Sequence, residues 1–236
     1  IAIAIASSSS DLPTAGPSSR VSPAMCSLSI GQLLVHGGRE GPMRPKSDCH
    51  LYNPSTKSWR ELAQSGDVPS ARWRHTLTQW LPGCAVMIGG RDAAGVCGGA
   101  TLLAAGNCCF EVCIGAENAD AGASTGNAVW SRLSAVGPAP TPRYAHAVAC
   151  ANEGVVVVSG GRVGGLRQLV TPLHLLIPPQ SIGAGVGAGV GVGVGAGAGV
   201  DEEHACKMLT PGAVARWEAP SFTPAIPSRY SHGCVA

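Results

Sequence analysis

The sequence has 236 residues, which is enough for one domain, and a formal net charge of +2 at pH 7. A net charge this small does not by itself indicate binding to nucleic acid or to a membrane. Ten cysteines are present, but none forms a CxxC pair and no Cys/His group has zinc-finger spacing, which argues against a zinc-binding module.

The cysteines and the start of the chain indicate the cellular compartment of the protein. Cys84, Cys113 and Cys150 stand in strand-like apolar runs, where cysteine acts as a small apolar residue. We therefore expect reduced thiols and a cytoplasmic location, with the nucleus as the alternative, over an oxidised, secreted framework. The chain begins at Ile1 without Met, and its first apolar run lacks the basic flank of a signal peptide. We expect a piece of a longer protein.

The N-terminal part leads into one well-preserved unit. Residues 1–19 are low in complexity and are predicted to be disordered. Arg20 marks a degenerate first unit, in which Ser22-Pro23-Ala24 replaces an expected histidine end, and the proline should limit strand pairing there. Residues 31–63 then contain short apolar and aromatic segments separated by Gly, Pro, Asn and Ser, which predicts strands and turns.

The landmarks of this unit recur in the same order along the chain. Each unit has an apolar run ending in a double glycine plus arginine, then a tryptophan, then a proline and an Arg-x-x-His end. The glycine landmarks are Gly37-Gly38-Arg39, Gly89-Gly90-Arg91 and Gly160-Gly161-Arg162. The tryptophans are Trp59, Trp130 and Trp217, and the ends run from Arg72, Arg143 and Arg229 to His75, His146 and His232. Glycine permits close backbone approach and tryptophan fills a core, so we interpret these landmarks as scaffold.

The later part of the chain follows the same plan with two interruptions. Residues 65–69 are predicted to be a loop between units. Third strands are predicted at Cys108–Ile114 and Leu173–Ile177. A low-complexity insertion occupies 179–212, where Gly183 to Val200 alternates Gly with Ala or Val. This stretch lacks Leu, Ile and Phe, so it predicts a surface-loop insertion and not a membrane span.

About 50 residues separate the first two double glycines, close to the kelch period. The glycines, tryptophans and Arg-x-x-His ends resemble the kelch family over roughly residues 20–236. This resemblance implies an all-β fold, a kelch-type β-propeller with four-stranded blades. The chain would supply an incomplete propeller of three blades, at 20–63, 72–135 and 143–219, plus the first strand of a fourth at 229–236.

The stretch from Gly37 to Asp48, GGREGPMRPKSD, also resembles the kelch portion of tRNA wybutosine-synthesizing proteins. That group joins a propeller to transferase domains that use S-adenosylmethionine. The resemblance implies a non-catalytic module in tRNA modification, with this cofactor expected only in a longer parent protein and none in this fragment. The sequence itself has no P-loop, GxSxG elbow or HExxH motif, so we predict no catalytic residue and no metal site.

The candidate contact surface consists of cations and aromatics at equivalent repeat positions. These residues are Arg39, Arg72, Trp73, Arg74, Arg91, Arg143, Tyr144, Arg162, Arg229 and Tyr230. Repeat symmetry would place them around one axis, where they could bind phosphate, RNA or an acidic peptide. The alternative interpretation is that the arginines brace loops through carboxylates and carbonyls. The repeated histidines are expected to be structural.

Two functions follow, with tRNA or a protein as the partner. The first is a module that places substrate or assembles domains in a tRNA wybutosine enzyme. The second is a general protein-interaction propeller, such as a ubiquitin-ligase substrate adaptor, beside a BTB or F-box segment. No membrane partner and no small-molecule site is predicted.

Overall fold

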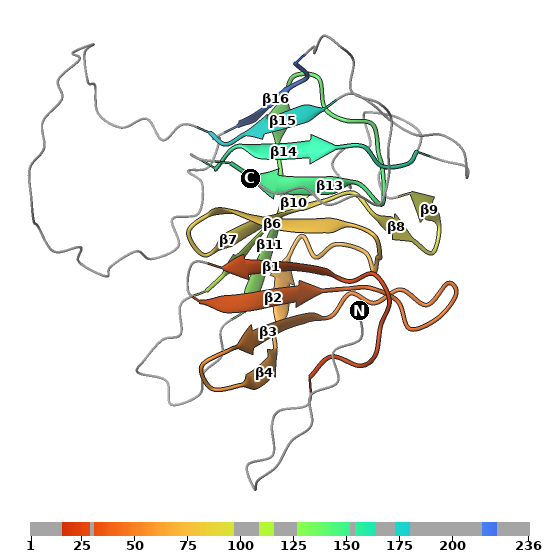
Figure 1. The fold of residues 1–236 in the computed structure, drawn as a ribbon, viewed down its shortest axis with the longest axis vertical. Helices are drawn as coiled ribbons and strands as arrows, with labels where there is room; N and C mark the ends of the chain where they lie inside the picture. The colour runs from red at the N-terminus through yellow and green to blue at the C-terminus, as the bar shows by residue number, and fades with distance from the viewer. Residues whose placement is uncertain are drawn as a thin grey trace, which may run out of the picture.

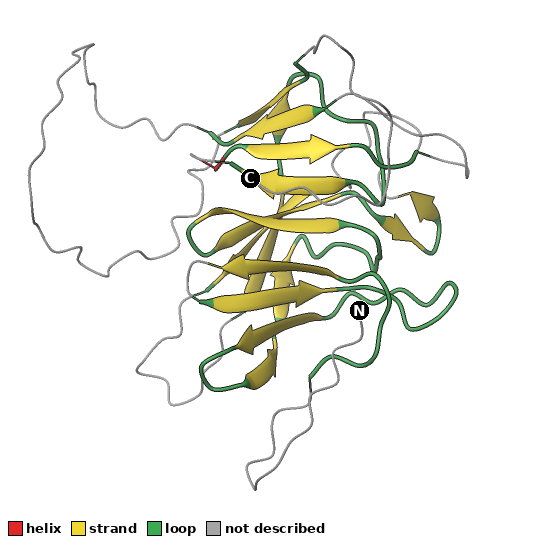
Figure 2. Cartoon of the chain, viewed as in Figure 1, coloured by secondary structure: helices red, strands yellow, loops and turns green. Residues whose placement is uncertain are grey.

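The computed structural model describes residues 16–28, 31–96, 109–115, 127–151, 154–163, 173–179 and 214–220. Within these ranges the chain consists of strands joined by loops (Figure 2). The predicted fourth-blade strand at 229–236, residues 1–15 and nearly all of the insertion at 179–212 lie outside them. The described part of the chain contains no helix with the length and apolar character needed to cross a membrane.

Blade 1 is an antiparallel sheet in the order β1-β2-β3-β4. Its strands are Ala24–Leu28 (β1), Gln32–His36 (β2), Cys49–Asn53 (β3) and Ser58–Glu61 (β4). The prediction that Pro23 limits strand pairing is wrong. Strand β1 begins one residue after the proline, and all five of its residues pair with β2, because only the proline itself lacks a backbone donor.

Blade 2 is a five-stranded sheet in the order β5-β11-β10-β7-β6. Its strands are Gln64–Gly66 (β5), Thr76–Leu81 (β6), Cys84–Ile88 (β7), Cys109–Ile114 (β10) and Ala128–Arg132 (β11). A small hairpin, Arg91–Asp92 (β8) and Gly95–Val96 (β9), follows β7. The prediction of a loop over 65–69 is corrected at its start, because β5 pairs in parallel with the outer strand β11.

Blade 3 repeats this arrangement, in the order β12-β16-β15-β14-β13. Its strands are Ala135–Val136 (β12), Ala147–Cys150 (β13), Val156–Ser159 (β14), His174–Ile177 (β15) and Ala215–Glu218 (β16). Strand β12, like β5, comes from the linker before the blade and pairs in parallel with the outer strand. The linker between blades therefore adds a fifth strand to the blade that follows it.

The three blades lie one after another, with blade 2 between the other two (Figure 1). The innermost strand of blade 2, β6, contacts both β1 and β13. One apolar core fills the space between blades 1 and 2, around Leu34, Met87 and Trp130. A second core lies between blades 2 and 3, around Val158 and Trp217. This order confirms the predicted all-β, partial propeller. Trp130 and Trp217 pack between blades, whereas Trp59 on β4 is only partly buried and stacks on Tyr52 of its own blade.

The cysteines differ from the prediction of reduced thiols throughout. Cys84 on β7 and Cys113 on β10 form a disulfide. The cause is strand register: these two residues stand directly opposite each other in the antiparallel pair, although 29 positions separate them in the chain. Cys26, Cys49 and Cys150 are free thiols.

Candidate interaction site

An arginine clamp closes each repeat on its own double glycine. The Nη1 atom of Arg72 donates to the carbonyl oxygen of Gly89 at 3.1 Å, and that of Arg143 donates to Gly160 at 3.0 Å. Arg20 makes the equivalent bond to Gly37 at 3.0 Å. Each pair is separated by the same 17 positions, so Arg20 is the first-blade member of the set although no Arg-x-x-His end follows it.

The same arginines join neighbouring blades through their backbones. The amide of Gly38 in blade 1 donates to the carbonyl oxygen of Arg72 at 2.9 Å, and Gly90 donates to Arg143 in the same way. Gly37 has a φ of +63°. A Cβ atom there would lie 2.6 Å from the carbonyl oxygen of Arg72 and 3.0 Å from the His75 ring, so glycine is required at this crossing. Each clamp therefore holds the start of one blade against the double glycine of the preceding blade.

Burial corrects part of the predicted contact surface. Arg72 and Arg143 are only 1% and 2% exposed, and Trp73 and Tyr144 are 4% and 1% exposed. These four side chains lie inside the protein, and the two guanidinium groups are already bonded to backbone carbonyls. They brace loops, as the alternative interpretation held, because the carbonyl of the first glycine in each pair needs a donor.

Partly exposed arginines remain, stacked with the buried aromatics in a cation–aromatic ladder. The Arg39 guanidinium carbon lies 5.5 Å from the centroid of the Trp73 ring. Arg91 lies 5.7 Å from that ring and 5.1 Å from the Tyr144 ring. Arg162 continues the series, since its backbone pairs with Tyr144 as that of Arg91 pairs with Trp73. Cations and rings thus alternate across the three blades.

Arg74 is the exposed cation beside this ladder. Its φ of +56° matches those of Ser22 and Ala145, which occupy the same position in the other repeats. Its amide donates to the Ser22 carbonyl at 3.1 Å, and its own carbonyl accepts from the Ala145 amide at 3.0 Å. The left-handed backbone at this position is therefore held by bonds between repeats, and it leaves the Arg74 side chain exposed.

Arg91 of the ladder has a buried polar atom. Among the described residues, nothing accepts a hydrogen bond from the buried Nε of Arg91. The loop after the first double glycine (residues 39–48) and the β8–β9 hairpin after the second project to the same side of the molecule (Figure 1). Arg39 and Arg91 begin these two segments. The predicted residues Arg229 and Tyr230 lie outside the described part of the chain.

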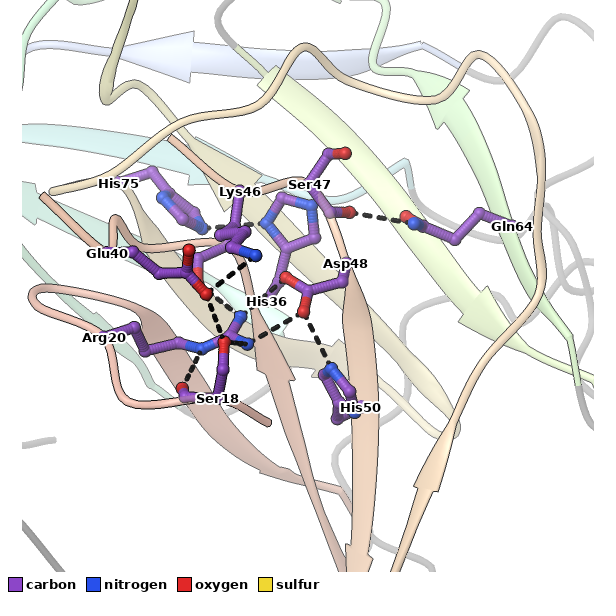
Figure 3. Close-up of polar contacts among 11 residues, drawn as sticks. Ser18, Arg20, His36, Glu40, Lys46, Ser47, Asp48, His50, Gln64 and His75 are labelled. Atoms are coloured by element: carbon purple, nitrogen blue, oxygen red, sulfur yellow. Dashed lines mark hydrogen bonds and ion pairs between the residues drawn. The ribbon is translucent and has the colours of Figure 1, made fainter. Parts of the chain in front are cut away.

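The first blade also holds a polar cluster that the sequence did not reveal. Arg20 and His50 converge on the Asp48 carboxylate, with contacts of 2.6 Å and 2.9 Å (Figure 3). Burial by itself would raise the pKa of Asp48, but the hydrogen bonds from Arg20 and His50 outweigh it and lower the pKa to about 2. Glu40 pairs with Lys46 at 2.8 Å and closes the loop above. Asp48 thus fixes the start of β3 against the first clamp.

The repeated histidines His75 and His146 are buried and hydrogen-bonded across blades, and His232 lies outside the described residues. His75 contacts His36 of blade 1, with Nε2 and Nδ1 3.0 Å apart (Figure 3). His146 contacts Thr76 of blade 2, with Nε2 and Oγ1 2.9 Å apart. These positions match the expectation of structural histidines. The sequence did not predict a role for His36, a second buried histidine at the position that Ile88 occupies in the next repeat.

The repeat geometry agrees with a known family. The KLHDC2/KLHL20/DRC7 Kelch-repeats domain matches residues 6–176. The chain belongs to this kelch family.

Curated relatives match shorter parts of the kelch domain. The tRNA wybutosine-synthesizing protein 4 of Gibberella zeae is 34% identical over 87 residues, covering 36% of this chain and 8% of the relative. The protein of that name from Neurospora crassa is 34% identical over 84 residues, covering 34% and 7%. Tip elongation aberrant protein 1 of Schizosaccharomyces pombe is 26% identical over 129 residues, covering 55% and 10%. The matched segments span a tenth or less of each relative.

Proposed function

We propose that this kelch domain is a non-catalytic interaction module of a multidomain protein for tRNA wybutosine synthesis. In this proposal the domain helps to hold the substrate tRNA. The observation that carries it is the cation–aromatic ladder with exposed Arg74 beside it. The similarity to two fungal tRNA wybutosine-synthesizing proteins supports the choice of partner.

The chemistry of the ladder suits a phosphate-rich ligand. Arg39 and Arg91 keep their guanidinium planes fixed against the Trp73 ring, so less side-chain entropy is lost when they bind an anion. Arg74 adds an exposed charge on a backbone that neighbouring repeats hold in place. Fixed planar cations with bidentate donors bind phosphate groups well.

The first test is tRNA binding by the complete chain at several salt concentrations. Arg74→Ala should weaken binding of a phenylalanine tRNA several-fold, because one phosphate contact is lost. It should also reduce the slope of log K against log salt by about 0.7 to 0.9. Alanine is tolerated at this backbone position, since Ala145 has a φ of +52° in the next repeat.

The matched control is Arg216→Ala, which removes an exposed arginine paired with Glu218 on the outer strand of blade 3. It should leave the affinity and the salt slope unchanged. Equal losses in Arg74→Ala and Arg216→Ala would show that only the net charge matters. Unchanged binding in Arg74→Ala and Arg91→Ala would remove the proposed site. The wybutosine assignment also requires a methyltransferase-type domain in the parent reading frame.

The second candidate is a protein-interaction propeller, such as a ubiquitin-ligase substrate adaptor. Membership of the kelch family supports it, and so does the similarity to Tip elongation aberrant protein 1, which covers more of this chain than the wybutosine relatives do. Here the ladder would dock an acidic peptide. Recovery of ligase subunits with the parent protein, without tRNA, would favour this function over the first.

A further inference from the structure

The disulfide between Cys84 and Cys113 has a carboxylate beside it. One ligand atom from each of Cys84, Cys113 and Glu111 lies within 4.8 Å of the other two. No other three His, Cys, Asp or Glu side chains in the described residues come this close. Two sulfurs and a carboxylate oxygen are ligands that zinc accepts in proteins.

Strand register explains why these groups meet. Residues 111 and 113 on β10 point to the same face, because side chains alternate along a strand. Cys84 stands opposite Cys113 in the adjacent strand β7, so its side chain joins that face. The face is the one that packs against blade 3 in the second core. The three groups therefore line the boundary between blades 2 and 3.

The carboxylate is held in place by a neighbour on a third strand. The indole Nε1 of Trp80 on β6 donates to Oε1 of Glu111 at 2.9 Å. Metal-binding carboxylates are typically oriented by such an outer hydrogen bond. Glu111 is only 6% exposed and the core around it is apolar, so a carboxyl group here needs a specific partner. The Trp80 indole donates a hydrogen bond to Glu111 but carries no positive charge, so it does not neutralise an ionised carboxylate.

We propose that Cys84, Cys113 and Glu111 form a redox-gated site for a thiophilic divalent cation such as Zn²⁺. In the oxidised protein the two sulfurs are bonded to each other and are not available as ligands. In the reduced protein both sulfurs and the carboxylate can reach one ion, with water in the fourth position. The ion then ties β7 to β10 where the disulfide did.

The chemical step balances with a dithiol reductant. The reductant supplies two electrons and two protons, the Sγ–Sγ bond breaks to give two thiols, and the reductant becomes a disulfide. Zn²⁺ then binds both sulfurs and a Glu111 oxygen, and it displaces both thiol protons and any proton on the Glu111 carboxyl group into solvent. In the reverse direction, a disulfide oxidant takes two electrons from the thiolates and releases the ion.

Electrostatics makes the ion necessary for ionised thiols in this core. Cys84, Cys113 and Glu111 are all buried, with exposed fractions of 1%, 4% and 6%. Three buried anions without a cation would be strongly unfavourable. A divalent ion offsets most of that charge. The exposed Pro82 and the half-buried Gly83 directly precede Cys84 in the chain.

The test uses the complete chain and Co²⁺ as a spectroscopic substitute for Zn²⁺. After reduction with a phosphine, one equivalent of Co²⁺ should give a thiolate-to-cobalt charge-transfer band, and the oxidised protein should give none. Glu111→Gln keeps the acceptor for Trp80 but removes the anionic ligand, so it should weaken binding about tenfold or more. Trp80→Phe should weaken binding about tenfold by freeing the carboxylate.

The matched controls separate this site from other thiols. Cys109→Ser lies on the same face of β10 and should keep the band, whereas the double variant Cys84→Ser, Cys113→Ser should lose it. A band that survives in the double variant would overturn the proposal. So would the absence of Co²⁺ binding by the reduced wild-type protein.

A second readout needs no variant to fold. In the reduced wild-type protein, alkylation of Cys84 and Cys113 should slow about tenfold when free Zn²⁺ is about ten times its dissociation constant, because only the metal-free form reacts. Cys26 and Cys150, which are partly buried free thiols, should alkylate at an unchanged rate. Equal rates at Cys84 and Cys113 with and without Zn²⁺ would contradict the site even if every variant fails to fold.

Discussion

At the scale of single residues, this protein uses different side chains for the same task in successive repeats. Between blades 1 and 2 the partner of His75 is His36, which stands opposite Ala24. Between blades 2 and 3 the partner of His146 is Thr76, which stands opposite Ile88. The two facing residues are therefore Ala24 and His36 in the β1–β2 pair, and Thr76 and Ile88 in the equivalent β6–β7 pair. Either pair supplies one polar atom to a buried imidazole.

The choice of histidine at position 36 makes stability depend on pH. Burial lowers the pKa of His36 to about 3, and burial and the neighbouring His36 ring lower that of His75 well below 6.5. At a pH below about 6.5 but above the lowered pKa values of the folded protein, these histidines bind protons in the unfolded chain and not in the folded chain. Stability should be fully present above about pH 6.5 and should fall as the pH drops below it.

The double variant Ala24→Thr, His36→Ile copies the second interface into the first and tests this prediction. The slope of unfolding free energy against pH should fall by about 1.4 kcal/mol per pH unit between about pH 4 and pH 6, since one buried histidine is removed. Urea unfolding at several pH values gives the slope. An unchanged slope would place the acid sensitivity elsewhere.

At the scale of elements, the parallel fifth strand joins each linker to the blade that follows. Gly66 at the end of β5 and Gly137 after β12 have φ values of +78° and +94°. A Cβ atom at either position would clash with the carbonyl oxygen of the outer-strand tryptophan, Trp130 or Trp217. The Trp130 indole also donates to Gln64 of β5 at 2.9 Å. The tryptophan thus anchors the linker as well as filling the core.

We expect Gly66→Ala to destabilise the protein by about 2 kcal/mol or more, from the positive φ and the clash together. Gly83→Ala is the matched control, because Gly83 has a similar φ of +70° with nothing within 4 Å of an added Cβ. It should cost about 1 kcal/mol. The difference in urea unfolding midpoint between Gly66→Ala and Gly83→Ala measures the contribution of the close approach of Gly66 to the Trp130 carbonyl oxygen. Equal losses of stability in Gly66→Ala and Gly83→Ala would mean that β5 can shift away from β11 with no loss of stability.

At the scale of the whole molecule, blade 2 is covered on both faces and the outer blades are each covered by one described neighbour. Leu34 in blade 1 and Leu176 in blade 3 are both 0% exposed, and they belong to different cores. In repeat architectures, stability is approximately the sum of unit and nearest-neighbour terms. A cavity in one core should therefore weaken one interface more than the other.

Leu34→Ala and Leu176→Ala form a matched pair for this prediction. Each should destabilise its own core by about 2 to 5 kcal/mol. Amide hydrogen exchange followed by mass spectrometry should show faster exchange in β2 and β3 for Leu34→Ala, and in β14 and β15 for Leu176→Ala. Uniform acceleration over all three blades in both variants would show that the chain unfolds as one unit.

Local sequence signals predicted most of the fold. The double glycines, the tryptophans and the Arg-x-x-His ends depend on backbone conformation and side-chain size at single positions, and such requirements recur visibly in a repeat. The predicted third strands at Cys108–Ile114 and Leu173–Ile177 match Cys109–Ile114 and His174–Ile177 to within one residue, because each is a short run of strand formers. The predicted contact surface stays a prediction, and burial removes Arg72, Trp73, Arg143 and Tyr144 from it.

Only the tertiary structure decided which side chains are buried and which come into contact, because both depend on which strands lie opposite each other. Burial separates the structural Arg72 from the exposed Arg74, two positions away. The repeat pattern marks Arg72 as a recurring residue but does not show that its side chain lies inside the protein. Register brings Cys84 to Cys113 and Glu111, and the crossing of blades brings His36 to His75. The sequence by itself determined that this chain repeats as kelch blades. Only the packing of one blade on the next determined which of its charged and sulfur-bearing groups meet.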